Sequence, residues 1–214
     1  MLLHVFDERT PKEITDEIKR FCEEVSPGEQ PFFVPVRPES GAVTSECHPN
    51  VERHVKAQGG EAVYGWIIWQ SPAVLHAEFH CNWRSPDGKL IDITPKADGE
   101  AEILFLPDQR YQWSGRAVPC RRKARRTDPM LAQFISVMDQ IARIQSKYLA
   151  GQPVSPIDAN RLIGLLRRAS NLMLAVSRSW GNSRRPAIGA AERRAEKKAQ
   201  RQRRKQQRRR RKPK

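Results

Sequence analysis

The sequence of 214 residues predicts an α+β fold followed by a helical hairpin and a polybasic tail. Three observations indicate this fold class. Apolar residues recur at helical spacing near both ends of the body, four strand-like runs lie between them, and the last 33 residues are rich in Lys and Arg. We therefore expect an α+β domain over 1–118, a basic linker over 119–127, a helical hairpin over 128–181 and a tail over 182–214.

Three predicted helices begin with a capping residue followed by proline, which fits the first helical position because its missing N–H would be unpaired there. Each then carries an apolar stripe at helical spacing. The short connection between the last two predicts an antiparallel hairpin. The expected boundaries are Thr10-Pro11 to Pro27-Gly28, Asp128-Pro129 to Gly151, and Ser155-Pro156 to Gly181.

A different pattern fills the chain between the first helix and the hairpin. A short helix is expected from about Ser45 to Ala57, ended by Gly59-Gly60. Runs of alternating or continuous apolar residues then predict the strands of an antiparallel meander. These runs are AVYGWIIW (62–69), VLHAEFHCNW (74–83), KLIDIT (89–94) and EILFL (102–106).

The turn Ser85-Pro86-Asp87-Gly88 fixes how the second and third of these strands pair. Proline suits the first central position of a type I turn, and Gly88 can take the left-handed position of a three-residue loop. Paired residue numbers then sum to 174, so His80 and Asp92 are diagonal neighbours on one face. That face is either a polar, functional cleft or an ordinary solvated surface.

Cys47 favours the functional interpretation. It lies at or beside the start of the predicted short helix, where the helix dipole and unpaired amides lower the pKa of a thiol. A nearby imidazole can pair with the thiolate, and a carboxylate can orient that imidazole. Cys47, His80 and Asp92 are therefore the expected catalytic residues, and Asn82 is expected to support the His80–Asp92 hydrogen bond.

Residues 44–95 resemble the transglutaminase-like branch of the papain-like cysteine enzymes. The matching features are Cys47 at a helix start, Gly59-Gly60 before AVYGWIIW, His80 on one strand and Asp92 of IDITP on the next. The resemblance implies a papain/transglutaminase-like core and a Cys-His-Asp triad. No side-chain donor lies close before Cys47, so backbone N–H groups of Cys47 and a neighbour are expected to stabilise an oxyanion.

Other uses of these residues remain open. Cys and His could bind zinc, but adjacent Cys-His pairs chelate poorly, and His76 and His80 would lie about 13 Å apart on a strand. We therefore expect neither a metal nor another cofactor. Tryptophans near the site either line a substrate groove or belong to the core. The proposed groove residues are Trp66, Trp69 and Trp83.

Most of the net charge of +15 resides in the tail, where residues 182–214 contain sixteen Lys or Arg and two Glu. Such a density of positive charge favours binding of residues 184–214 to the phosphates of DNA or RNA. This binding would depend on salt and not on nucleotide sequence. A tail that only aids solubility, and one that binds anionic membranes or acidic proteins, are alternatives. The proposed contacts are Arg201, Arg203, Arg204, Lys205, Arg208, Arg209, Arg210, Arg211 and Lys212.

These features predict a cysteine hydrolase or acyl transferase that acts on an amide, ester or thioester of a protein or small acyl substrate. The tail would tether it to nucleic acid. The alternative is a non-catalytic nucleic-acid-binding protein that uses the same fold as a scaffold. Four scattered cysteines, no secretory signal and no run of about 18 apolar residues lead us to expect a cytoplasmic protein without a membrane span.

Overall fold

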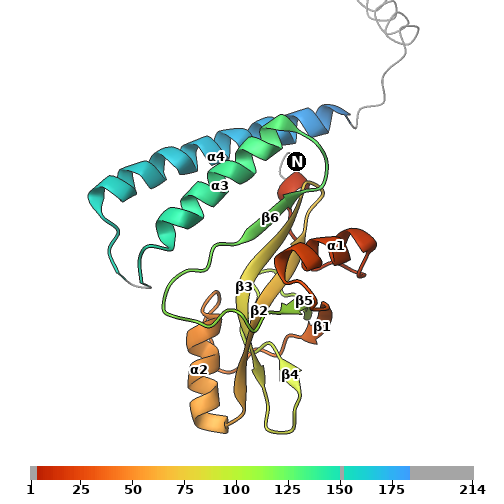
Figure 1. The fold of residues 1–214 in the computed structure, drawn as a ribbon, viewed down its shortest axis with the longest axis vertical. Coiled ribbons are helices and arrows are strands. Elements are labelled where there is room, and N and C mark those ends of the chain that lie inside the picture. The colour runs from red at the N-terminus through yellow and green to blue at the C-terminus, as the bar shows by residue number, and fades with distance from the viewer. Residues whose placement is uncertain (1–3, 150–151, 184–214) are drawn as a thin grey trace, which may run out of the picture. The chain divides into compact units, whose positions relative to one another are not determined.

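The computed structural model describes residues 4–149 and 152–183 and has an α+β fold (Figure 1). The described residues form four α-helices and a six-stranded antiparallel sheet with the order β1-β5-β2-β3-β4, in which β6 also pairs with β3. The chain divides into two compact units, Met1–Ser177 and Arg178–Lys214. The sheet belongs to the first unit, and only residues 178–183 of the second are described.

Helix α1 spans Asp16–Val25 and covers part of the sheet core. Its apolar residues Ile18, Phe21 and Val25 pack in one cluster with Trp66 of the sheet. The predicted start at Thr10 was wrong, because Thr15 is the N-cap and its side chain accepts a hydrogen bond from Ile18 N at 3.3 Å. Both threonines precede the same apolar stripe, and the first polar turn after Thr10 stays outside the helix.

The strands lie close to the predicted runs. Only the third run is much shorter than expected, because Asp92 leaves the β3–β4 ladder and forms an isolated bridge with Val36. Arg37 N donates to Asp92 O at 2.8 Å, and Asp92 N donates to Pro35 O at 3.0 Å. The strand bounds are β1 Phe32–Pro35, β2 Glu61–Gln70, β3 Val74–Arg84, β4 Leu90–Ile91, β5 Glu102–Pro107 and β6 Arg121–Ala124.

Strand β3 pairs with β2 along one edge over residues 75–84, and its other edge is only partly paired. On the second edge β4 pairs with residues 83–84, and β6 pairs with residues 74–77. Within the described chain, residues 78–82 therefore have no strand partner on that edge. Within the predicted linker 119–127, Arg121–Ala124 forms strand β6, which pairs with β3.

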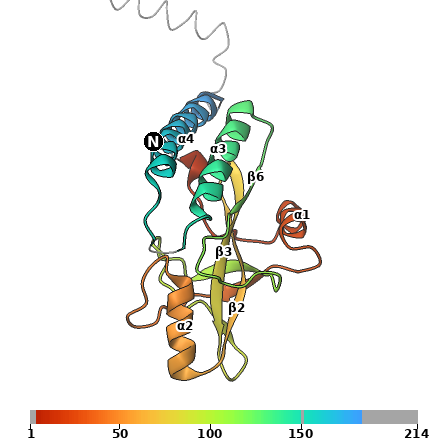
Figure 2. The ribbon, with the colours of Figure 1, turned by 60° about the vertical axis from the view of Figure 1, so that its left-hand side comes forward.

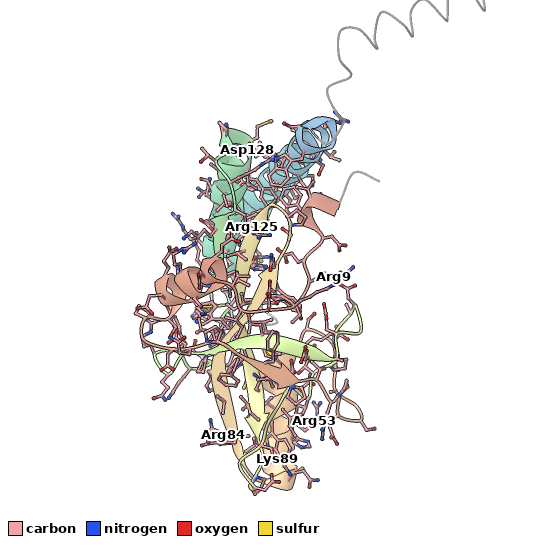
Figure 3. All side chains as sticks on the ribbon, turned by 90° about the vertical axis from the view of Figure 1, so that its right-hand side faces the viewer. Arg9, Arg53, Arg84, Lys89, Arg125 and Asp128 are labelled. Atoms are coloured by element: carbon pink, nitrogen blue, oxygen red, sulfur yellow. The ribbon has the colours of Figure 1, made fainter. Side chains whose placement is uncertain are left out.

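The β3–β4 hairpin has the predicted register. Trp83 pairs with Ile91 and Arg84 with Leu90, so the paired numbers sum to 174. Ser85 N donates to Lys89 O at 2.9 Å, and Gly88 has a φ of 85°, which only glycine adopts without strain. Arg84 and Lys89 mark the hairpin in Figure 3. This register places His80 and Asp92 diagonally across the two chains.

Helix α2 spans Cys47–Gln58 and packs beside β3 (Figures 1 and 2). Val51 and Val55 form a cluster with Cys81 and Trp83 of that strand. The helix ends at Gly59, as predicted, with a φ of 74°. Because this packing fixes the helix along β3, it also fixes the position of its first residue, Cys47.

Helices α3 (Pro129–Gln145) and α4 (Pro156–Ser183) form the predicted hairpin and lie side by side in Figures 1 and 2. Asp128 caps α3 as expected, accepting hydrogen bonds from the N–H groups of Met130 and Leu131. Val137 and Ile141 pack against Ala169 between the two helices. Helix α4 continues to Ser183, past the predicted end at Gly181. Across residues 4–149 and 152–183, no helix has the combined length and apolarity of a membrane span.

Candidate active site

The polar face of β3 is buried, which contradicts the alternative of a solvated surface. His76, His80 and Asn82 alternate along this face and expose 8%, 4% and 0% of their surface. Glu78, which lies between His76 and His80 on the same face, is exposed. A buried polar side chain needs a partner, because an unpaired one loses its hydrogen bonds with water. The contacts of these residues therefore define a site.

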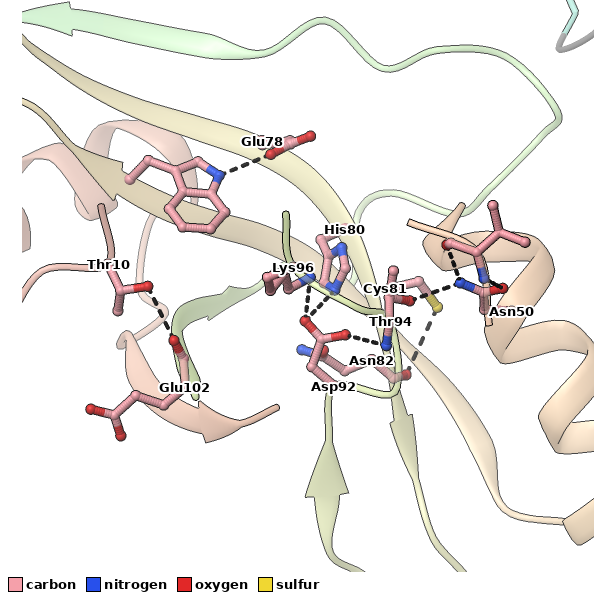
Figure 4. A network of polar contacts seen from close by, with 12 residues as sticks. Thr10, Asn50, Glu78, His80, Cys81, Asn82, Asp92, Thr94, Lys96 and Glu102 are labelled. Atoms are coloured by element: carbon pink, nitrogen blue, oxygen red, sulfur yellow. Dashed lines mark hydrogen bonds and ion pairs between the residues drawn. The ribbon is translucent and has the colours of Figure 1, made fainter. Parts of the chain in front are cut away.

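His80 and Asp92 form the predicted pair. His80 Nε2 lies 3.0 Å from Asp92 Oδ2, and Asp92 is completely buried (Figure 4). The pairing of Nε2 with the carboxylate leaves Nδ1 as the ring nitrogen that can face a thiol. Burial alone would lower the pKa of His80, but the charges of Asp92 and Cys47 outweigh it and raise that pKa to about 9.

Asp92 is held by more than the imidazole. Thr94 N donates to its Oδ1 at 2.9 Å, and Lys96 Nζ lies 2.5 Å from its Oδ2. Burial raises the pKa of Asp92, but the charge and hydrogen bond of His80, together with Lys96, lower it to about 2. The carboxylate therefore stays ionised and fixes the His80 ring.

Cys47 is the first residue of α2, and the preceding Glu46 provides no side-chain cap. In the described chain, the N–H groups of Cys47 and His48 donate to no acceptor, and Pro49 has no N–H to donate. Two unpaired amides thus lie at the positive end of the helix dipole. These are the backbone donors that an oxyanion at this position would need.

The Cys47 thiol has an environment unlike that of the other cysteines of the core. Burial raises its pKa, but the charge of His80 and the neighbouring imidazoles of His48 and His80 lower it to about 5. Burial raises the pKa of Cys22 to about 12, and burial and the Cys47 charge raise that of Cys81. These pKa shifts favour a thiolate at Cys47 and an imidazolium at His80 near neutral pH.

Cys47 and His80 line one pocket of about 450 Å³. Of the three tryptophans expected there, only Trp69 lines it. Trp66 is completely buried and donates from Nε1 to Asp108, while Trp83 donates from Nε1 to the carbonyl oxygen of Gly59, the C-cap residue of α2. The prediction that Trp66 and Trp83 line a substrate groove was therefore wrong. The indole N–H of each donates a hydrogen bond to another residue of the fold.

Asn82 lies in the site region but does not support the triad as predicted. It is completely buried, and neither its Nδ2 nor its Oδ1 has a hydrogen-bond partner among the described residues. Its neighbour across the sheet is Val63, and the carboxylate oxygens of Asp92 are already occupied by His80, Thr94 and Lys96. The prediction for Asn82 was wrong because it considered the strand face without the loop after β4.

Sequence reasoning missed His48 and Trp113 as pocket residues. The His48 ring stacks on Trp113 with centroids 4.1 Å apart and an interplanar angle of 4°. His48 follows Cys47 directly, which was a signal of proximity, whereas Trp113 lies in an irregular segment that no pattern places. The stacking holds an imidazole beside the helix N-terminus, where it helps to lower the pKa of Cys47.

Asn50 and Ser45 also position the site without a clear signal in the sequence. Buried Asn50 donates to Thr94 Oγ1 at 3.2 Å and to Val43 O at 2.8 Å, so it joins α2 to the loop that carries Asp92 (Figure 4). Ser45 has a φ of 67°, which is unusual for a residue other than glycine. Such backbone strain two residues before Cys47 is typical of functional sites.

The remaining predictions concern metals and the tail. Among the described residues, no group of three or more His, Cys, Asp or Glu side chains is arranged to hold a metal ion. The nine basic residues proposed to bind nucleic acid lie outside the described residues. Comparison of the chain with protein-family models, with curated proteins and with solved structures gave no match.

Proposed function

We propose that this protein is a cysteine-dependent hydrolase or acyl transferase that acts on an amide, ester or thioester through Cys47, His80 and Asp92. One observation carries the proposal: a thiol at an uncapped helix N-terminus shares a pocket with a buried imidazole–carboxylate pair. In this proposal the arrangement is that of a papain/transglutaminase-like core, which residues 44–95 resemble in sequence. The lowered pKa of Cys47 supports it, because thiolate is the reactive form.

In the first step, the Cys47 thiolate attacks the carbonyl carbon of the substrate and forms a sulfur–carbon bond. His80 donates its Nδ1 proton to the leaving nitrogen, oxygen or sulfur as the bond to that atom breaks. Asp92 keeps the Nε2–H of His80 in place and stabilises the charged ring before the transfer. The N–H groups of Cys47 and His48 stabilise the transient oxyanion.

In the second step, water or another acceptor attacks the Cys47 thioester. The acceptor gives its proton to His80, the sulfur–carbon bond breaks, and the Cys47 thiolate is restored. Water gives hydrolysis, whereas an amine, alcohol or thiol gives acyl transfer. Because the same pocket serves both steps, its access to water decides between them.

The proposal is tested with p-nitrophenyl acetate as an ester probe. Wild-type protein should release a burst of p-nitrophenol close to one equivalent per chain, because acylation of Cys47 is faster than deacylation. Cys47→Ala should show no burst and unchanged thermal unfolding. His80→Ala should slow acylation by about 10²–10⁴-fold through loss of proton transfer.

Cys22→Ala is the matched control. Cys22 lies on α1, is buried in the cluster that α1 forms with the sheet, and does not line the pocket. It should keep the full burst. A burst that survives in Cys47→Ala, or that is lost equally in Cys22→Ala, would refute the assignment of Cys47 as nucleophile.

We also propose that the tail tethers the enzyme to DNA or RNA in the cytoplasm. The support is its charge, since residues 182–214 carry sixteen Lys or Arg against two Glu. Binding should be released by salt, with a slope that reports the number of phosphates neutralised. The non-catalytic alternative predicts that this binding is the whole function and that Cys47 is dispensable.

The tail is tested by changing nine basic residues to Gln in the full chain and measuring affinity for duplex DNA and single-stranded RNA against salt. The variant should lose most of its affinity and most of its salt slope, while the p-nitrophenol burst stays unchanged. Equal affinity of the two proteins would refute the tether. The changed residues are Arg201, Arg203, Arg204, Lys205, Arg208, Arg209, Arg210, Arg211 and Lys212.

A further inference from the structure

A second histidine on β3 has contacts that the proposed triad does not use. His76 lies four residues before His80 on the same face, so the two side chains are about 13 Å apart along the strand. It is 8% exposed, and its Nδ1 lies 3.0 Å from Glu8 Oε2. His76 is thus oriented by a carboxylate, as His80 is.

The segment that carries Glu8 is attached to the end of β2. Arg9 N donates to Gln70 O at 2.9 Å, and Gln70 N donates to Arg9 O at 2.9 Å. These two hydrogen bonds fix the backbone next to Glu8. The Glu8–His76 contact is therefore a feature of the fold and not an incidental surface pair.

The other ring nitrogen of His76 has no hydrogen-bond partner among the described residues. Nε2 is buried and makes no hydrogen bond to any described residue. A buried nitrogen of this kind is costly unless a ligand or a transient partner uses it. Since Nδ1 is engaged by Glu8, Nε2 is the nitrogen available for proton transfer.

Cys120 lies near His76 and could exchange a proton with its Nε2. Strand β6 pairs with β3 so that His76 faces Arg122, and Cys120 is two residues before Arg122 on the same alternation. Cys120 is therefore a diagonal neighbour of His76, the relation that Asp92 has to His80 across β4. Cys120 is partly exposed, and it lines the pocket together with Glu8.

We propose that Glu8, His76 and Cys120 form a second thiol–imidazole–carboxylate site, in which Cys120 accepts acyl groups from small thioesters that enter the pocket lined by Glu8 and Cys120. The proposal does not require Cys47 to be catalytic. The electrostatics agree with it: burial lowers the pKa of His76, but the neighbouring Cys120 and Glu8 raise it to about 9.

The chemical class follows from what the site lacks. Cys120 precedes strand β6, so its own backbone does not begin a helix whose free amides could stabilise an oxyanion. Only an acyl donor with a good leaving group should react. The Cys120 thiol gives its proton to His76 Nε2 as its sulfur attacks the thioester carbonyl carbon. The bond from that carbon to the donor sulfur then breaks, and the released thiolate takes the same proton from His76.

The test uses full-length Cys47→Ala protein and phenyl thioacetate as the probe. Intact mass and peptide mapping follow the gain of one acetyl group on Cys120. Cys47→Ala should be acetylated on Cys120, and adding His76→Gln should slow the reaction by about ten-fold or more, a typical loss for a general acid–base group. Adding Glu8→Gln should slow it by a smaller factor.

His54→Gln is the matched control, because His54 lies on α2 and contacts Trp83 outside the pocket. It should leave Cys120 acetylation unchanged. Buried Cys22 and Cys81 report unfolding, since they react only if the core opens. If His76→Gln exposes them, Glu8→Gln decides the test, as the Glu8 side chain is 38% exposed and tolerates change.

The proposal would be overturned if His76→Gln left the rate of Cys120 acetylation unchanged. Where Glu8→Gln decides the test, an unchanged rate in that variant would overturn it. So would the absence of acetylation in the Cys47→Ala protein. Peptide mapping of wild-type protein reads Cys47 and Cys120 separately. Failure at one sulfur is therefore distinguished from failure at the other.

Discussion

His80 and His76 occupy the same face of β3 and each lies 3.0 Å from a carboxylate, but the carboxylates differ. Asp92 is completely buried and is held by Thr94 and Lys96 as well as by His80. Glu8 is partly exposed and can be screened by water and salt. The two pairs therefore have equal lengths, and what separates them is how far water and salt can reach the carboxylate.

The surroundings of the two sulfurs, Cys47 and Cys120, also differ. Cys47 begins a helix and has free amides beside it, whereas Cys120 lies in the segment that enters β6. The first sulfur can attack amides or esters because an oxyanion there is stabilised. The second should react only with activated acyl donors.

The largest expected effect comes from comparing Asp92→Asn with Glu8→Gln in p-nitrophenyl acetate turnover. Asp92→Asn removes the buried charge that stabilises the His80 imidazolium, so kcat should fall by about 10²–10⁴-fold. Glu8→Gln should change turnover by Cys47 by less than about three-fold, because Glu8 contacts the other histidine. Similar losses in the two variants would contradict the separation of the two sites.

The pH dependence of the Cys47 reaction should be bell-shaped. The pKa of Cys47 is lowered to about 5 and that of His80 raised to about 9, so the reactive ion pair exists between these limits. Because the two groups interact, the limbs belong to the pair. The rate constant kcat/KM should fall roughly ten-fold for each pH unit beyond either limb. A single limb near the ordinary thiol pKa would show that no ion pair forms.

Asn50 should have an intermediate effect through positioning. Asn50→Ala removes its hydrogen bonds to Thr94 and Val43, so the free energy of unfolding should fall by about 1–3 kcal/mol in urea titrations. The rate should fall by about ten-fold at unchanged pH limbs, since the ion pair remains but is less well placed.

Asn82→Leu is the matched control for Asn50→Ala. Both amides are buried on or beside β3, but Asn82 has no hydrogen-bond partner among the described residues. An apolar side chain of similar volume should therefore leave stability unchanged or increase it, and leave turnover intact. Loss of turnover in Asn82→Leu would restore the supporting role predicted from the sequence.

Lys96 should have the smallest effect. Its positive charge lowers the pKa of His80 and of Asp92. Lys96→Met should therefore move the basic limb of the kcat/KM profile upward, with a change of less than about ten-fold at neutral pH. A downward movement of that limb would contradict the conclusion that the charge of Lys96 lowers the pKa of His80.

The core of the triad was predictable because each part depends on local rules. Turn chemistry at Ser85-Pro86-Asp87-Gly88 fixed the register of His80 with Asp92, and a helix start identified Cys47. The order of helix and strand runs sufficed for the α+β class for the same reason. Pairing across a hairpin requires only the residues of the turn and the strand period.

What escaped prediction depends on contacts between distant segments. Lys96 and Thr94 reach Asp92 only because the chain leaves β4 early to pair with Val36. Glu8 reaches His76 across 68 residues, and β6 joins β3 although its sequence, RRKA, is charged and gave the expectation of a linker. Tertiary packing overrides local propensity in such segments.

The central claim is that Cys47 and His80 form a thiolate–imidazolium pair at neutral pH. The ultraviolet absorbance of thiolate, titrated in wild type, Cys47→Ala and His80→Ala, tests it most directly. Wild type minus Cys47→Ala should show one thiolate that ionises at a pKa of about 5, and His80→Ala should move that pKa upward. A Cys47 that ionises at the ordinary thiol pKa, with or without His80, would contradict the claim.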